Sequence, residues 1–188
     1  MSTTLKRILI GAVVVAAMVF GIRRYQLVQT KKASPEETIS FYFMNADSLN
    51  VEITYCRPYK KGRVIFGGLV PYNKVWRTGA NEATLITVSK DIRFGDKPIR
   101  AGTYTLWTMP GPDAWTVYLN SKMYSWGVDM DGNAQRDPAF DVAAVSVPVK
   151  AAANAPVEQF RINMEEDSTA LALTLTWDDV MVAVPIVR

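Results

Sequence analysis

The residues best suited to binding chemistry lie in one short stretch, VWRTGANEAT, residues 75–84. This stretch sets an indole beside a guanidinium and adds a side-chain amide and a carboxylate. Guanidinium groups bind the oxygens of carboxylate, phosphate or sulfate in pairs, and aromatic rings can wall a pocket. With two arginines that precede it, the stretch predicts a site for a small anionic or carbohydrate-like ligand. The predicted ligand-binding residues are Arg57, Arg63, Trp76, Arg77, Asn81 and Glu82.

The same residues also suit a structural role. Arginines in β-sandwiches can bond loop carbonyl groups, and a Trp can close the end of a sheet. Gly79 would then permit a turn that a side chain obstructs, and Glu82 would be a buried ion-pair partner. A ligand site requires these groups to converge on an open cleft, whereas a structural role leaves them bonded within the domain.

The chain has no histidine and a single cysteine, Cys56. This composition excludes Ser-His-Asp and Cys-His catalysis, His-ligated metal sites and an intrachain disulfide. We therefore predict no catalytic residue, no cofactor and no metal ion. Whether the protein is an enzyme stays open: the alternative is a hydrolase or isomerase that uses Glu82 with Arg57 and Arg77, or Glu82 with Asp141 as a carboxylate pair.

A second acidic stretch, DMDGNAQRD at residues 129–137, resembles a calcium loop only weakly. Loops of the EF-hand type need Gly at the sixth position and Glu at the twelfth. Ala134 and Phe140 stand at those positions. Asp-Gly-Asn is also ordinary turn chemistry.

The first 32 residues hold six Lys and Arg and no acid, and the remaining 156 hold 15 Lys and Arg against 18 Asp and Glu. The main domain thus has a net charge of −3 and lacks the broad basic field of a nucleic-acid-binding protein. We predict no nucleic-acid partner.

An uncharged, mostly apolar run, Ile8–Ile22, lies between two basic pairs near the N-terminus. A cleaved signal peptide and an uncleaved anchor both have such a run. The Arg pair that follows favours an anchor, with residues Leu5 to Tyr25 in the membrane. We predict an anchor or uncleaved signal sequence over 1–25, a linker over 26–38 and a domain over 39–188. Within the linker, SPEE at 34–37 predicts one helical turn.

Alternating apolar residues dominate the chain after the linker, as in WTVYLN at 115–120 and LALTLTW at 171–177. Turn signals such as PGPD and WDD separate these runs. We predict an all-β fold, an antiparallel β-sandwich or partly closed barrel of about eight to nine strands, preceded by one transmembrane helix.

Several motifs occur in one order: YCRPY, KGRVIFG, LVPY, VWRTGANEAT, AGTYTL, WTVYLN, WG and VEQFRI. In this order the chain resembles an uncharacterised family called domain of unknown function 2911, from Ala33 to about Ile186. The resemblance implies an exported bacterial protein with a β-sandwich-like core and no established activity. The chain departs from the family pattern at one point. The resemblance implies an Asp followed three residues later by Arg, and here Asp141 stands at the Asp position but Ala144 stands where Arg is expected.

Charge alone leaves the orientation open, because the basic residues are heavier after the apolar run while the Lys-Arg before it favours export. The resemblance favours export: a single-pass protein of the cytoplasmic (inner) membrane with its C-terminal domain in the periplasm. We predict a non-catalytic accessory subunit or binding module of a bacterial envelope membrane complex. Its partner would be a membrane protein or a small ligand, and the Gly- and Ala-rich helix can pack closely against other helices.

Overall fold

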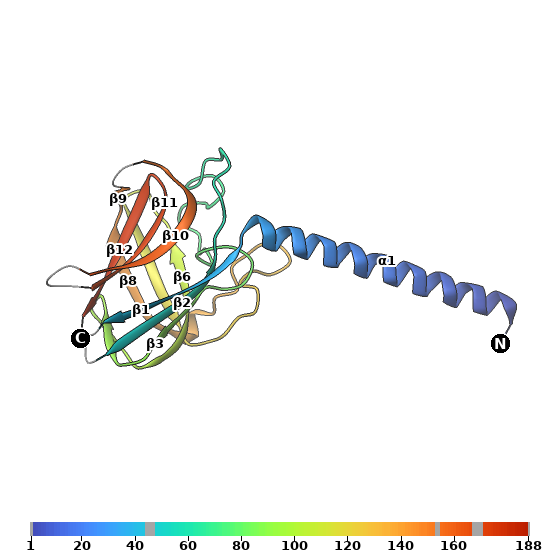
Figure 1. The fold of residues 1–188 in the computed structure, drawn as a ribbon, viewed down its shortest axis with the longest axis horizontal. Helices are drawn as coiled ribbons and strands as arrows, with labels where there is room; N and C mark the ends of the chain where they lie inside the picture. Colours follow the sequence, from blue (N-terminus) through green and yellow to red (C-terminus); the bar gives the residue numbers. More distant parts are fainter. Residues whose placement is uncertain (1, 44–47, 153–154, 167–170, 188) are drawn as a thin grey trace. The chain divides into compact units, whose positions relative to one another are not determined.

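The computed structural model describes residues 2–43, 48–152, 155–166 and 171–187 (Figure 1). The chain divides into two compact units between Ala33 and Ser34. This division falls inside the segment 26–38 that the sequence assigned to a linker. Each unit is described separately below.

The N-terminal unit is one helix, α1 (Thr3–Ala33), which has no buried residue. Helix-forming Leu, Ala, Met, Arg and Lys fill it without a proline, and Lys31 and Lys32 in its last turn favour the helix dipole. It ends just before Pro35, because a residue that precedes proline is disfavoured in helical conformation. The helix is long and apolar enough to cross a membrane. Leu5 to Tyr25 would span about 31 Å as a helix, close to the thickness of the hydrocarbon core.

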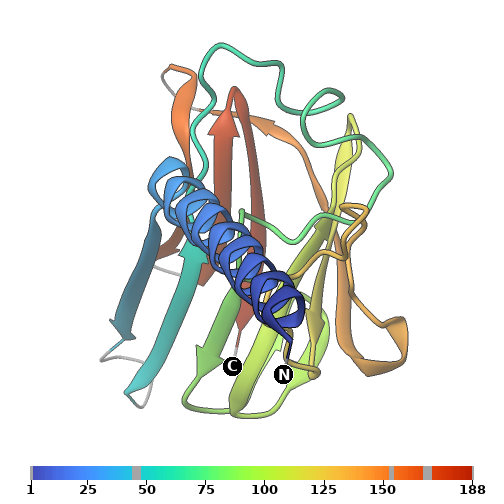
Figure 2. The ribbon, with the colours of Figure 1, turned by 90° about the vertical axis from the view of Figure 1, so that its right-hand side faces the viewer.

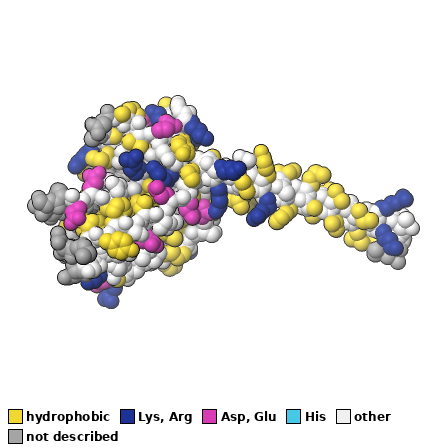
Figure 3. Space-filling view, viewed as in Figure 1, with side chains coloured by type: hydrophobic (Ala, Val, Ile, Leu, Met, Phe, Trp, Pro, Cys, Tyr) yellow, Lys and Arg dark blue, Asp and Glu magenta, His cyan; other side chains and the backbone are white. Residues whose placement is uncertain are grey.

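Figure 3 shows hydrophobic side chains along most of α1, with Lys and Arg gathered toward its two ends. This pattern fits a membrane segment whose basic side chains reach the two polar interfaces.

The C-terminal unit is an antiparallel β-sandwich, as the alternating pattern predicted (Figures 1 and 2). The first sheet has six strands in the order β1-β2-β3-β6-β7-β8. Their bounds are β1 (Glu36–Phe43), β2 (Leu49–Cys56), β3 (Leu85–Val88), β6 (Gly102–Met109), β7 (Ala114–Asn120) and β8 (Asp141–Pro148).

The second sheet has the order β10-β11-β12-β4-β5, and β9 pairs with β12. Its strands are β4 (Ile92–Phe94), β5 (Lys97–Ile99), β9 (Lys150–Ala151), β10 (Val157–Glu166), β11 (Leu171–Asp178) and β12 (Val180–Val187). The described residues thus form twelve strands, more than the eight or nine expected. Three of them (β4, β5 and β9) have two or three residues, too few to show an alternating pattern.

The helical turn predicted at SPEE is wrong, because Glu36 begins β1. Glu36 and Glu37 pair with Cys56 and Tyr55 of β2. Pairing with the neighbouring strand supplies backbone hydrogen bonds that the capping signal alone could not outweigh. A short 3-10 helix, η1 (Pro138–Phe140), precedes β8.

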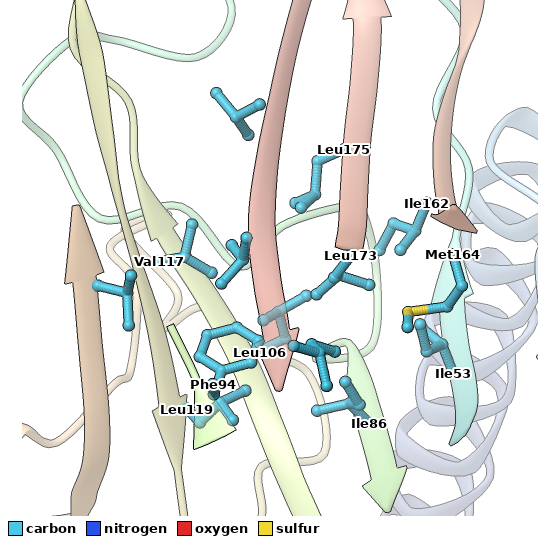
Figure 4. Packing of buried hydrophobic residues seen from close by; sticks show 14 of the residues in the cluster. Ile53, Ile86, Phe94, Leu106, Val117, Leu119, Ile162, Met164, Leu173 and Leu175 are labelled. Carbon is cyan, nitrogen blue, oxygen red and sulfur yellow. The ribbon is translucent and has the colours of Figure 1, made fainter. Parts of the chain in front are cut away.

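A single hydrophobic core fills the space between the sheets. Figure 4 shows Ile53 and Ile86 of the first sheet near Met164 and Leu173 of the second. On β11, Leu171, Leu173 and Leu175 all point inward, as their period of two requires.

Aromatic side chains close this core toward one end of the sandwich. The Trp76 ring stacks on Trp177 with centroids 5.9 Å apart and packs at 5.0 Å against Phe160. Phe66 packs edge-on against Trp115 at 4.8 Å. These rings fix the long connection between β2 and β3, which carries both VWRTGANEAT and the two preceding arginines.

Candidate functional site

The stretch 75–84 lies in the connection between β2 and β3, at the end of the sandwich where β1 begins. Trp76 is its one point of sheet-like pairing: its N–H donates to the Thr108 carbonyl, and the Thr108 N–H donates back. Thr78 and Asn81 have positive φ angles of 57° and 58°. Such angles are uncommon for residues other than glycine, so the surrounding bonds must hold this backbone.

Trp76 is part of the aromatic core and does not wall an open cleft. Its ring packs among Phe66, Trp115, Phe160 and Trp177. Its indole N–H donates to the Gly79 carbonyl at 3.0 Å. Both the apolar body and the polar edge of this side chain are therefore used within the domain.

Arg77 is also bonded within the domain. Its Nη1 donates to the Asn81 carbonyl at 3.2 Å and to the Trp126 carbonyl at 3.3 Å. Burial lowers the pKa of Arg77 from its usual value, although Cys56 and Glu82 act in the opposite direction. A Cβ on Gly127 would lie 3.1 Å from the Arg77 Cβ, so the side chain is closely covered.

Gly79 lets the turn approach the end of β2, and two threonines bond the turn internally and to β6. A Cβ at Gly79, where φ is +145°, would lie 2.8 Å from the Cys56 carbonyl oxygen. The Thr84 hydroxyl donates to the Thr78 carbonyl at 2.6 Å, and the Thr78 hydroxyl donates to Thr108 Oγ1 at 3.1 Å. The backbone therefore crosses β2 at a distance that only glycine allows.

Asn81 and Arg57 hold the chain where it enters β1. The Asn81 side-chain amide donates to the Ser34 carbonyl at 3.2 Å. Arg57 forms an ion pair with Glu37 at 3.0 Å and donates through Nε to the Phe160 carbonyl at 3.1 Å. These bonds join β1, β2 and β10 and leave neither side chain directed at a shared cleft.

Arg63 lies apart from the other predicted residues. Its side chain is exposed, and its guanidinium donates to the carbonyl groups of Lys60 and Tyr59. The three arginines thus bond to three different parts of the backbone, and no common site for one anion forms from them.

Glu82 lines a cavity in the described part of the domain. The cavity measures about 200 Å³ and is lined by Glu36, Thr54, Tyr55, Cys56, Glu82, Ala83, Leu85, Tyr124 and Ser125. The Cys56 thiol donates to Glu82 Oε2 at 3.4 Å. Burial, reinforced by Glu82, raises the pKa of Cys56 to about 11. A thiol that stays protonated near neutral pH is a poor nucleophile, which agrees with the expectation from the missing histidine.

Three of the cavity residues could offer ligands to a metal ion. One donor atom from each of Glu36, Cys56 and Glu82 lies within 4.8 Å of the others. A metal would require the thiolate, whereas the burial of Cys56 and the neighbouring carboxylate favour the neutral thiol. Binding of a metal ion here would therefore release the Cys56 proton, and its affinity should rise with pH.

Tyr55 was one of the aromatic residues that the sequence suggested as a pocket wall, with Trp76 and Trp107, and it does line this cavity. Glu36 and Tyr124 were not predicted as site residues. Glu36 comes to the cavity because it pairs with Cys56 across β1 and β2. Tyr124 comes from the irregular segment after β7, far away in the sequence. Their types carry no special signal: the register of β1 and β2 could have identified Glu36, whereas Tyr124 lies outside the strands.

Asp141 does not pair with Glu82. Its two oxygens accept from Arg136, Nε to Oδ1 at 3.0 Å and Nη2 to Oδ2 at 2.6 Å. The Arg136 guanidinium also lies 3.8 Å over the Tyr118 ring, and Tyr118 pairs across the strands with Ala144. Arg136 thus places a guanidinium beside Asp141 on the strand face that Ala144 shares with Tyr118.

In the acidic loop 129–137, Asp129 uses its carboxylate for the loop's own turn. Asp129 Oδ1 accepts from the backbone N–H groups of Asp131 and Asn133 at 3.0 and 2.8 Å. The hydrogen bonds from Asn133 lower the pKa of Asp129. This is the turn chemistry that the sequence left as the alternative to calcium.

The comparisons with known proteins agree with the resemblance seen in the motifs. A family model described as a protein of unknown function (DUF2911) matches residues 34–186. The searches of curated proteins and of solved structures found no match.

Proposed function

Since the chain belongs to the DUF2911 family of unknown function, we propose a role on the basis of its own geometry. The protein is a non-catalytic β-sandwich module, anchored in the cytoplasmic membrane by α1, with its domain in the periplasm. It serves as an accessory subunit or binding module of an envelope membrane complex.

The observation that carries this proposal is α1 itself. None of the 31 residues of the helix is buried, and the residues of its apolar run do not belong to the hydrophobic core of the domain. Apolar side chains exposed over this length are unfavourable in water and stable in a bilayer. A membrane is the environment that accounts for them.

The loops support the non-catalytic part. Trp76, Arg77 and Asn81 bond within the domain, and Cys56 is held as a neutral thiol. Stabilising the domain is therefore the role that best fits VWRTGANEAT.

Anchoring is tested by the mass of the mature N-terminus, measured on protein extracted from membranes. Retention of the residues before Ile8 supports the anchor. A chain that begins after Ala17 would mean a cleaved signal sequence and would overturn this part of the proposal. Protease added to spheroplasts should remove the domain, whereas protection of the domain would place it in the cytoplasm.

Partner association is tested by co-purification from detergent extracts. Ala17 and Gly21 lie four residues apart on one side of α1, a spacing that allows close helix contact. A Cβ at Gly21 or at Gly11 would meet nothing within 4 Å in this chain. Gly21→Leu should release a membrane partner and Gly11→Leu, on another side, should not. A complex that survives exchange of the whole helix for an unrelated anchor would contradict an accessory role through α1.

The cavity beside Glu82 favours a second candidate, the binding of a small ligand. A volume of about 200 Å³ is below the range of drug-sized ligand sites, so any ligand would be small. Glu82→Gln keeps the shape and removes the charge. A ligand whose affinity falls in this variant while the melting temperature is kept would support binding there.

A further inference from the structure

The connection between β2 and β3 also contains a loop, residues 61–74, that holds apolar side chains out into solvent. Val64 is 72% exposed, Leu69 46% and Tyr72 39%. Figure 2 shows the connection, in teal and green, running across one end of the strands. Exposed apolar groups gathered in one loop point to a surface that is covered in use.

This loop is well ordered by its own packing. Ile65, Phe66 and Val70 are buried in the core. The Leu69 N–H donates to the Val64 carbonyl at 3.0 Å, which brings these two exposed residues together. The core residues therefore hold the loop in place while its neighbours project outward.

Two glycines fix the exposed side chains more closely. A Cβ at Gly68 would lie 2.5 Å from the Val64 carbonyl oxygen, and one at Gly67 would lie 2.8 Å from the Tyr72 ring. The Tyr72 ring thus packs directly on the loop backbone. The packing of the loop therefore fixes the positions of these exposed apolar side chains.

Basic residues lie close in the sequence to these exposed apolar residues. Between Glu52 and Glu82 the chain contains six Lys and Arg and no acid. Three of the six are used inside the domain: Arg57 pairs with Glu37, Lys60 pairs with Asp178, and Arg77 is partly buried among carbonyl groups.

The other three, Lys61, Arg63 and Lys74, are exposed. One neighbouring acid, Glu158, accepts the backbone N–H of Lys61 at 2.8 Å. The loop therefore combines three surface cations with three apolar side chains, although the domain as a whole is mildly acidic.

The loop lies at the end of the sandwich where the chain enters from α1. The Asn73 N–H donates to the Pro110 carbonyl in the turn between β6 and β7. The Arg57 N–H, just before the loop, donates to the Pro35 carbonyl at 2.9 Å. Beyond Tyr25, only about 12 Å of helix separates the proposed membrane span from this entry point.

We propose that the loop 61–74 docks the domain on a lipid bilayer with anionic headgroups. The cations would meet the headgroups, and Val64, Leu69 and Tyr72 would enter the polar boundary of the bilayer. Three side chains are a small area for a stable protein interface, which usually takes 20 to 30 residues on each side, but they suffice for an interfacial anchor.

This proposal rests on the proposed membrane anchoring, because a tether makes a weak surface contact effective. Linking two contacts turns the second into an intramolecular event with an effective concentration of about 1 mM or more. The intrinsic affinity of the loop for lipid can therefore be low and still keep the docked state populated.

The test uses the domain without α1, residues 34–188. Among the described residues, all the buried hydrophobic ones lie in this unit, so the core it forms does not depend on α1. Sedimentation is measured with vesicles of phosphatidylcholine alone and of an equal mixture of phosphatidylcholine and phosphatidylglycerol. We expect partitioning roughly tenfold stronger into the anionic vesicles, and weakening by salt.

Two loop variants separate the apolar and charged contributions. Val64→Ser with Leu69→Ser, and Lys61→Gln with Lys74→Gln, should each reduce binding to anionic vesicles at least about fivefold. The matched controls are Tyr42→Ser and Lys90→Gln, exposed residues near the opposite end of the strands. The controls should bind as the parent does, and all variants should keep its melting temperature.

Equal binding to both vesicle types, or no loss in the loop variants, would overturn the proposal. If the loop variants instead lose a co-purified protein and keep lipid binding, the surface serves a protein partner. Failure with vesicles leaves the anchor untouched, since the mass of the mature N-terminus tests that separately.

Discussion

Two neighbouring parts of one connection show how misleading residue type alone can be. The stretch 75–84 contains the residues that suggest a binding site, and the structure bonds most of them to their own domain. The loop 61–74 suggests ordinary connecting chain, and it holds Val64 and Leu69 in solvent. The direction in which a side chain points, set by backbone packing, decides whether its chemistry is available.

The strongest test of this contrast compares Trp76 with Tyr72. Trp76→Ala removes a ring that packs against four other rings and should lower the free energy of unfolding by about 3–5 kcal/mol. Tyr72→Ala, in the exposed loop, should cost about 1 kcal/mol or less. Urea denaturation of both variants measures the difference. Equal losses would mean that the two regions do not differ in structural role.

A glycine pair sharpens the contrast at the level of the backbone. Gly79→Ala puts a methyl group 2.8 Å from the Cys56 carbonyl at a φ of +145°, whereas Gly62→Ala, at +69°, meets nothing within 4 Å. We expect a loss of about 3 kcal/mol for Gly79 and about 1 kcal/mol for Gly62. Thermal melting should rank them in this order. The reverse order would argue against the close crossing of β2.

Alkaline pH tests the burial of the cavity thiol. The pKa of Cys56 rises to about 11 in the folded protein from an ordinary value near 9.0. The folded state therefore keeps the proton longer, and stability present below about pH 9 should decline between pH 9 and 11, by about 2 kcal/mol in all.

The control for this experiment is Cys56→Ala, which should lose less stability over the same pH range. The pKa of Tyr55 is raised to about 12 mainly by burial. Its ionisation lowers the stability of both proteins, but at a higher pH than that of Cys56. Parallel curves for the parent and the variant would contradict a buried neutral thiol.

The smallest effect is expected at the charges of the loop. Lys61→Gln with Lys74→Gln should change the free energy of unfolding by less than about 0.5 kcal/mol, because both side chains are exposed. Denaturation in urea should overlay that of the parent. A large loss would show that these lysines stabilise the fold and would weaken their assignment to a lipid surface.

The fold was predictable because its signals are local. The alternation of apolar residues along β7 and β11 predicts a β-sandwich. The order of the motifs predicts the family, which the family model confirms. The strands β4, β5 and β9 were missed because two or three residues carry no period. The turn at SPEE was wrong because pairing of β1 with β2 decided the conformation.

The site was less predictable because it depends on contacts between distant segments. The Arg57 ion pair with Glu37 and the approach of Glu36 to Cys56 both follow from strand register. The basic loop is hidden in the net charge of the whole domain, because there the acids outnumber the bases. Only the fold shows which charges remain on the surface.

Arg136 has a consequence for how this family varies. Its guanidinium donates to the Asp141 carboxylate and lies over the ring of Tyr118. Tyr118 is the cross-strand partner of Ala144. A second guanidinium from position 144 would compete for one carboxylate and one ring, and the two like charges would repel. We therefore expect positions 136 and 144 to covary among relatives, with arginine at one or the other. Ala144→Arg should therefore lower the melting temperature more in the parent than in a chain that carries Arg136→Ala, with a small cost in both because residue 144 is exposed.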